Sequence, residues 1–501
     1  MNRRTLRASS IHGFVKSGRG ICIFGPGSLV VWADLRRSLS APLVPSMKMG
    51  LCALLVMLPA AAAAPRAAHG VETVSIAQAL AFAYAGNPAL RAERARQRAT
   101  DEAVPQALSG WRPVIVADAD AGLAWTNSNR GRGKDRQPFG AAITLSQPVF
   151  RGFRTVSGTA RAEAIVNAGR QSLLAVEQQV LLDAASAYMN VIRDRNILGL
   201  RQSNVKALKA QLRASEERLT VGEDTRTDVS QAKARLALAH AALARTEAEL
   251  ASSLAFYARV IGRTARGLRF PPLSKQAPQS LDAALAIADR SNPSILAAAF
   301  NEEAARHNID LVRGELLPEV SINAQFAHNQ QPSDALDWNE QGAIVGQVRM
   351  PIYEGGEVYS RVREAKQTAS QRTLEILDIR RQVRQQVTEA WNLLIAATAT
   401  IRAARVQVRA NRQALDGVQQ EMLVGTRTVL DVLDAEQELV DSQVLLATAE
   451  RDRIIAGYQL IAAVGLMTAR VLNLDVMPYD PELNYRETRG KFIGTAVELV
   501  D

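Results

Sequence analysis

The chain contains two copies of one pattern, and this duplication limits what it can fold into. Residues 221–229 read VGEDTRTDV and residues 424–432 read VGTRTVLDV, with Gly222 and Gly425 lying 203 residues apart. A long helix-compatible run precedes each Gly and a shorter one follows it. Gly just past a long helix is the usual left-handed stop, and Thr and Asp favour the start of the next helix. The two segments are therefore predicted to be the tips of two long helical hairpins, about 221–228 and 424–434.

The duplication runs through most of the chain. Each half begins with a short helix-compatible segment that leads to Asn-Pro, a favourable helix start with Asn as the cap and Pro at the first helical position. Three pairs of prolines keep an offset of 203 to 205 residues: Pro88 and Pro293, Pro113 and Pro318, and Pro148 and Pro351. We therefore expect two structural repeats, 71–270 and 275–474. Each has the order short helix, helix, strand, loop, strand, very long helix, tip, long helix.

The longest predicted helices are unusual for a globular protein. Residues 152–221 contain no Pro and few Gly, and residues 355–424 match them in length. At about 1.5 Å per residue, each would form a rod of roughly 100 Å. Helices of this length belong to coiled coils, stalks or helical barrels.

Four segments alternate between apolar and polar residues, at about 114–127, 141–150, 319–327 and 343–353. Their length suits tilted strands that cross a bilayer, although a soluble sheet with one wet face is the alternative. The polar segments at 127–139 and 328–341, read as loops, favour the membrane reading, as does the lack of an apolar run of about 18 residues beyond the leader. Four strands cannot close a barrel, and lipid does not tolerate open sheet edges. Several chains would have to pool their strands.

The N-terminal region is interpreted as a leader. Residues 47–69 have a basic start, a short apolar core and a run of Ala, which together predict a secretory signal peptide. Residues 1–46 show no pattern and are interpreted as a mis-assigned start. Residues 1–69 hold nine Lys or Arg and one acidic residue, so the net charge falls from +10 to about +2 without them. The charge therefore does not support nucleic-acid binding.

The sequence shows no catalytic constellation. Both cysteines, Cys22 and Cys52, lie in the leader, and no HExxH, GxSxG or P-loop pattern occurs. The five histidines are scattered, so we expect no enzyme activity, no metal site and no cofactor. Residues 475–501 are expected to form an extended segment.

These features resemble the outer-membrane export channels of the TolC type. The resemblance rests on the duplicated layout, the Asn-Pro helix starts, the strand ends that contain Pro and the second tip motif. It implies a mainly helical fold with transmembrane β-strands, in which three chains form a twelve-stranded β-barrel on an α-helical barrel in the periplasm. It also implies an exit duct for a tripartite efflux pump or a type I secretion system. The implied partners are a homotrimer, a periplasmic adaptor, an inner-membrane transporter of the RND or ABC type, and outer-membrane lipid.

The resemblance also assigns roles at the tips. Asp431 and Asp434 resemble two acidic rings that line a closed gate, and Arg427 resembles a latch whose partners would be Thr227 and Asp228. The alternatives are an Asp that complements the helix dipole and an Arg that is a solvated surface charge. The chain departs from the family pattern at Met422, where the type member has a tyrosine, so part of the latch is in question. A periplasmic adaptor or a structural coiled coil is the alternative function.

Overall fold

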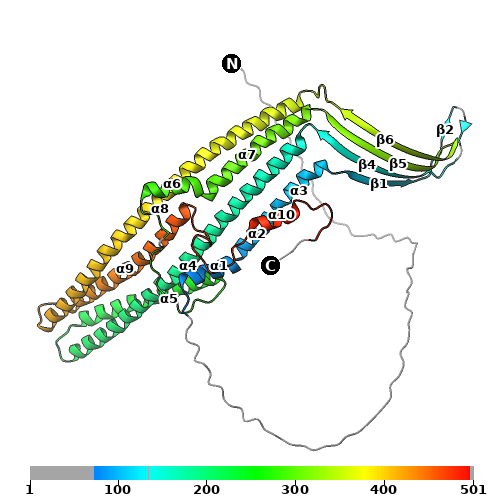
Figure 1. Cartoon of the computed structure of the whole chain (residues 1–501). Helices are drawn as coiled ribbons and strands as arrows, with labels where there is room; N and C mark the ends of the chain where they lie inside the picture. Colours follow the sequence, from blue (N-terminus) through cyan, green and yellow to red (C-terminus); the bar gives the residue numbers. More distant parts are fainter. Residues whose placement is uncertain (1–72, 130, 134, 275, 497–501) are drawn as a thin grey trace, which may run out of the picture. The chain divides into compact units, whose positions relative to one another are not determined.

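A computed structural model of the chain describes residues 73–129, 131–133, 135–274 and 276–496 (Figure 1). The expected signal peptide and the segment before it lie outside these residues. The first repeat comprises α1 (Ile76–Gly86), α2 (Pro88–Asp101), α3 (Ala103–Leu108), η1 (Ser109–Trp111), β1 (Val114–Ala121), β2 (Asn127–Ser128), β3 (Gly131–Arg132), β4 (Phe139–Arg151), α4 (Arg154–Thr220) and α5 (Arg226–Ile261). The second comprises α6 (Leu281–Ser291), α7 (Pro293–Arg313), η2 (Gly314–Leu316), β5 (Glu319–Ser333), β6 (Leu336–Arg349), α8 (Glu357–Leu423) and α9 (Val429–Ala463), and α10 (Pro481–Thr488) follows. Long helical hairpins and four long antiparallel strands are confirmed.

The two Asn-Pro motifs each serve two helices. Asn87 caps α2 by accepting the backbone N–H of Ala89 at 2.9 Å, and its amide donates to the carbonyl of Val260 at 3.0 Å. Asn292 caps α7 in the same way and donates to the carbonyl of Ala463 at 2.9 Å. The last carbonyls of a helix lack partners within it, so each Asn satisfies one helix start and one helix end. These contacts place the start of α2 against the end of α5 and the start of α7 against the end of α9.

The long helices α4 and α8 form the framework of the described part. Helix α4 packs against α5 and α9 toward the tips and against α2, α3 and α7 toward the sheet, and α8 packs against α9, α7 and α6. The largest core cluster gathers around Leu181 and Tyr188 of α4, with residues of α1, α5 and α9. A second cluster joins Val387 of α8 to Leu460 of α9. Burial of these apolar side chains is the main stabilising contribution.

The sheet has the order β1-β4-β5-β6 and is antiparallel throughout. Successive residues of a strand point to opposite faces, so the register separates two kinds of surface. One face carries the cross-strand rows Ile115, Leu145, Ala324, Ile344 and Ala117, Ile143, Phe326, Gly342. The other carries Val116, Thr144, Gln325, Ala343 and Asp120, Gly140, Asn329, Asn339. The apolar face is exposed in the single chain, with Ile344 80% and Phe326 55% accessible.

The strand limits differ from those expected. Strands β5 and β6 continue through most of the segment 328–341 that we read as a loop, because polar side chains do not interrupt backbone pairing: Asn329 is opposite Asn339. Strand β1 ends at Ala121, well before residue 127, and the chain enters the short β2–β3 hairpin. Strand β6 ends at Arg349, before Pro351, which lacks the N–H that pairing requires.

The expected extended C-terminal segment is wrong in one respect, because it contains helix α10. Asp480 caps this helix by accepting the backbone N–H of Glu482 at 2.9 Å, and Pro481 occupies the first helical position. Both are favourable helix starts, which outweighed the short length. Among the helices of the described residues, none is both long and apolar enough to cross a membrane.

Candidate functional site: the paired hairpin tips

The two hairpin tips turn by the same backbone device. Gly222 and Gly425 have φ of 83° and 79°, a left-handed conformation that side chains disfavour. The N–H of Gly222 donates to the carbonyl of Leu219 at 3.2 Å, and the N–H of Gly425 donates to the carbonyl of Met422 at 3.0 Å. The N–H of the residue after each Gly donates to the carbonyl one residue earlier, that of Arg218 at the first tip and of Glu421 at the second, which completes a Schellman motif. The Val-Gly pairs therefore end α4 and α8 in the same way.

Each returning helix begins with a capping box. At the first tip, the N–H of Asp228 donates to Thr225 Oγ1 at 3.2 Å, and the N–H of Thr225 donates to Asp228 Oδ2 at 3.0 Å. At the second, Thr428 and Asp431 make the same pair of bonds at 3.3 and 2.9 Å. Thr225 Oγ1 also donates to Asp228 Oδ2, and Thr428 Oγ1 to Asp431 Oδ2, each at 2.7 Å. The bonds that each carboxylate accepts lower its pKa, for Asp228 mainly through the side chain of Thr225 and for Asp431 mainly through the backbone N–H of Thr428. In the single chain, Asp431 is thus the capping-box partner of Thr428 as well as a gate candidate.

Arg427 is held within its own tip. Its Nε donates to Glu421 Oε2 at 2.9 Å, and its Nη1 lies 3.8 Å from Asp431 Oδ1. Within the described residues of one chain, Arg427 is joined to these two carboxylates and not to Thr227 or Asp228. Met422 packs partly buried in the apolar cluster between the hairpins, so an apolar contact occupies the place of the family tyrosine.

The two hairpins are tied together near the tips. Asp434 of α9 forms an ion pair with Arg235 of α5. Beneath it, Leu208 of α4 and Leu433 of α9 belong to one buried cluster. Asp431 and Asp434 lie three residues apart on α9 and therefore share one helical face. That face is accessible in the single chain, where the Asp434 side chain is 52% exposed.

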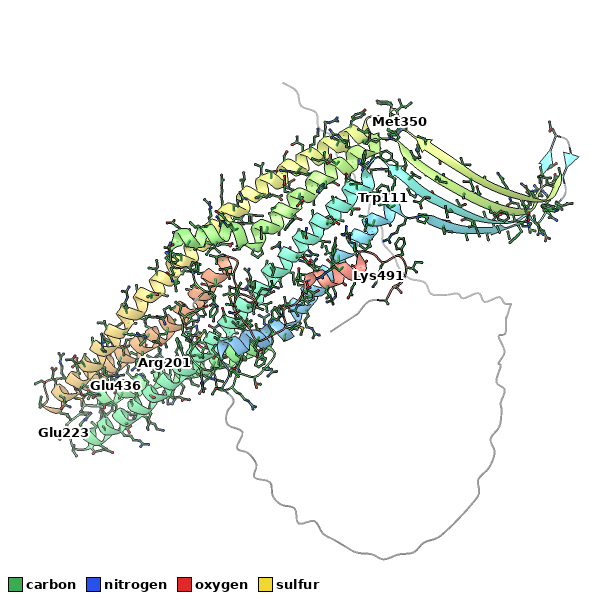
Figure 2. The ribbon with its side chains drawn as sticks, in the orientation of Figure 1. Trp111, Arg201, Glu223, Met350, Glu436 and Lys491 are labelled. Atoms are coloured by element: carbon green, nitrogen blue, oxygen red, sulfur yellow. The ribbon has the colours of Figure 1, made fainter. Side chains whose placement is uncertain are left out.

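One partly buried carboxylate near the tips was missed by sequence reasoning. Glu436, labelled at the tip end in Figure 2, has its Oε2 buried without a hydrogen-bond partner, and burial raises the pKa of its carboxyl. A helical pattern of charged residues does not show which one faces the partner helix. Glu421 and Arg235 were also missed. The offset between the repeats would have found Glu421, because it corresponds to Arg218 in the first tip.

The described residues contain no group of three or more His, Cys, Asp or Glu side chains placed to hold a metal ion. The tips instead present capped helix starts, paired charges and two carboxylates on one accessible face. Such an arrangement can attract cations and can change with the packing of the hairpins. It points to a gate or a docking surface.

Comparison with known proteins identifies the family. The model of the family "Outer membrane efflux protein" matches residues 80–263 and 284–466, which coincide with the two repeats. The outer membrane efflux protein BepC of Brucella suis biovar 1 is 37% identical over 421 residues, covering 83% of this chain and 91% of BepC. The outer membrane protein TolC of Escherichia coli K12 is 26% identical over 428 residues, covering 80% of this chain and 85% of TolC.

A solved structure has the same fold. The Campylobacter jejuni CmeC outer membrane channel matches with a TM-score of 0.72 at 15% identity, covering 83% of this chain and 89% of that one. The adaptor and the structural coiled coil, kept as alternatives above, are therefore set aside. The chain belongs to the outer membrane efflux protein family, as a non-enzymatic TolC-type channel of the outer membrane that serves efflux or secretion.

Proposed function

We propose that three copies of this chain form the exit duct of a tripartite efflux pump or a type I secretion system. The observation that carries the proposal is the four-stranded sheet, which has one apolar face and free edges at β1 and β6. Three copies joined edge to edge would give a closed twelve-stranded barrel with the apolar face in lipid and the amide-rich face toward water. The amides of that face already bond one another, since Asn323 Nδ2 donates to Gln347 Oε1 at 3.1 Å. The helical part would then project into the periplasm.

The tips supply the proposed gate. In a trimer, Asp431 and Asp434 would bring six carboxylates to the axis and favour cations there. In the closed state, Arg427 would reach Thr227 and Asp228 of the neighbouring hairpin, and it would lose its contact with Glu421 in doing so. Opening would separate the hairpins and with them the two acidic rings.

The implied partners are a periplasmic adaptor and an inner-membrane transporter of the RND or ABC type. Two duplicated basic pairs support docking of an acidic partner: Lys206 and Lys209 on α4, and Arg409 and Arg412 on α8. Within the described chain all four are exposed and none has an ion-pair partner, whereas most other cations near the tips are paired. The members of each pair are three residues apart and share a helical face. Each pair lies 16 and 13 residues before the tip Gly, so a trimer would present six equivalent positions.

The first experiment measures single-channel currents of the purified protein in planar bilayers, with its mass determined in parallel by native mass spectrometry. We expect a species of three chains and small cation-selective currents. Folded protein that stays monomeric, or that inserts no conducting species, would contradict the proposal. The mass of the mature N-terminus tests whether residues 47–69 are removed as a signal peptide.

A further inference from the structure

The C-terminal residues are fixed firmly to the first repeat. Asn484 of α10 donates to Asp101 Oδ2 at 2.8 Å, and Asp101 is fully buried in α2. Arg489 forms an ion pair with Glu163 of α4 at 2.9 Å. Tyr485 packs against the small apolar cluster formed by α3 and α4. Helix α10 therefore has a defined place, and so does the segment that follows it.

That segment ends beside the start of β1. Arg112 Nη1 donates to the carbonyl of Lys491 at 2.7 Å, and its guanidinium lies 4.0 Å from the ring centroid of Phe492, a cation–π contact. Arg112 stands two residues before Val114, the first residue of β1. Figure 2 shows Trp111 and Lys491 in the region where the helices meet the sheet, far from Glu223 at the tips.

The position of Phe492 beside Arg112 matters because the apolar face of the sheet begins just after Arg112. Ile115 is the first residue of β1 on that face and is 65% exposed. It follows Arg112 by three residues, which span at most about 10 Å of extended chain. Phe492, in contact with Arg112, therefore lies close to the boundary where the proposed lipid-facing surface starts.

The residues at this point have the composition of a membrane interface. Phe492 is 72% and Ile493 is 96% exposed, and the cations Arg112 and Lys491 lie next to them. Aromatic side chains concentrate at the interface of lipid and water, and Lys and Arg extend from there to the headgroups. Two adjacent, largely exposed apolar side chains on an anchored segment are better explained by contact with an apolar surface than by contact with water.

We propose that residues 491–493 form an interfacial hook, which inserts Phe492 and Ile493 into the headgroup boundary of the periplasmic leaflet. The ligand is the phospholipid surface, with Lys491 and Arg112 placed to meet its phosphates. The inference rests on the proposed function, because the sheet must lie in lipid for the hook to reach the leaflet. Its role is to fix the height of the helical part relative to the membrane.

Nitroxide labelling tests the hook in the full chain. The two cysteines, Cys22 and Cys52, precede the described residues and are replaced by Ser, so that an introduced Cys is the single labelling site. Ile493→Cys is compared with Ile344→Cys on the apolar face and with Glu487→Cys on the exposed side of α10. Collision of each label with oxygen and with a water-soluble nickel chelate is measured in vesicles of phosphatidylethanolamine and phosphatidylglycerol.

We expect the oxygen-to-nickel collision ratio at Ile493→Cys to be several-fold above that at Glu487→Cys and below that at Ile344→Cys. A ratio equal to that of Glu487→Cys would overturn the hook in favour of contact with water. Low collision with both reagents would overturn it in favour of burial against a second copy of the chain. If Ile344→Cys itself is accessible to nickel, the membrane placement of the sheet fails, and this result is distinct from failure of the hook alone.

Arg112 supplies the second test. Adding Arg112→Ala to Ile493→Cys removes the hydrogen bond and the cation–π contact, so the label should become more mobile and lose most of its excess oxygen collision. Arg112→Lys keeps a cation near the Phe492 ring and should retain part of it. Equal ratios for all three backgrounds would show that Arg112 does not position the segment.

Discussion

Glu421 and Arg427 form an ion pair at 2.9 Å that is the charge-reversed counterpart of the pair between Arg218 and Asp224 at 3.1 Å. Each pair joins the last turn of a very long helix to the loop after its Gly, and the two occupy equivalent positions of the repeats. The duplication has thus kept an attraction at each tip while exchanging the signs. At the second tip the cation of this pair, Arg427, also lies 3.8 Å from Asp431, one of the proposed gate carboxylates.

The ion pair of Glu421 and Arg427 predicts how charge substitutions at the second tip change the opening of the channel. Glu421→Arg would place two cations together and expel Arg427 from its own tip, whereas Glu421→Arg combined with Arg427→Asp would copy the first tip. Because exposed pairs contribute about 0.2–1 kcal/mol, the single change should shift the opening equilibrium by about fivefold at most. The measurement is single-channel conductance. The double variant restores attraction within the tip but lacks the proposed latch arginine, so it should remain altered if Arg427 reaches the neighbouring hairpin. A return to wild-type conductance would show instead that attraction within the tip is what matters.

The proposed gate carboxylates, Asp431 and Asp434, predict a change in the block of the channel by cations. Asp431→Ala with Asp434→Ala should raise conductance and weaken block by multivalent cations, because both rings are removed from the axis. Asp431→Ala also removes one half of the capping box that starts α9, which weakens that helix start by itself. Planar-bilayer recordings with increasing multivalent cation measure the effect.

Thr225→Ala is the matched control for that experiment. Thr225 caps α5 at the first tip as Thr428 caps α9, and it belongs neither to the acidic rings nor to the proposed latch. Its loss breaks the capping box of α5, as the loss of Asp431 breaks that of α9, so it should lower the thermal midpoint by at least as much while cation block remains. If Thr225→Ala abolishes block equally, the effect comes from frayed helices and the acidic gate is wrong.

Glu436 predicts a stability that depends on pH. Burial raises the pKa of its carboxyl, so the folded state favours the protonated form. The free energy of unfolding therefore decreases as pH rises through the folded pKa, and the charge is destabilising at neutral pH. Glu436→Gln should raise the thermal midpoint at pH 7, and the gain should disappear below the ordinary glutamate pKa of about 4.3.

Glu438→Gln is its control, since Glu438 is an exposed neighbour on the same helix. Glu438→Gln should leave the thermal midpoint nearly unchanged at pH 7 and at pH 4. A gain of Glu436→Gln that persists at pH 4, or that Glu438→Gln shares, would mean that general charge reduction is responsible.

The sequence predicted the architecture wherever contacts between residues close in sequence determine it. The Gly stops, the Thr and Asp starts and the Asn-Pro motifs act through contacts within a few residues, so periodicity and spacing predicted the hairpins. The sequence did not predict where β5 and β6 end. Asn329 and Asn339 are paired through their backbones, and the pattern of apolar side chains does not reveal such pairing.

Some contacts at the tips could be predicted from residue spacing, and others could not. Thr428 with Asp431 follows from a spacing of three residues, as a capping box does. The ion pair of Arg235 with Asp434 depends on how two hairpins pack, which no spacing within one helix reveals. The burial of Glu436 depends on the same packing.

Glu177, which lies within α4 and nearer to the sheet than to the tips, offers a last prediction. Its side chain is 8% exposed, and Oε1 accepts the backbone N–H of Ala469 at 2.7 Å, which ties α4 to the segment after α9. Burial raises the pKa of this carboxyl, so its negative charge destabilises the folded state. Its oxygen is nevertheless the hydrogen-bond acceptor for the N–H of Ala469. Glu177→Ala leaves the N–H without a partner and should cost about 1–3 kcal/mol.

Glu177→Gln separates the two effects, because its amide oxygen can still accept that hydrogen bond and it carries no charge. Its thermal midpoint should stay near wild type at pH 7, well above that of Glu177→Ala. Equal losses in the two variants would mean that the negative charge is what joins α4 to this segment. The coulombic attraction of Arg94 and Arg470 would then outweigh the desolvation of the carboxylate.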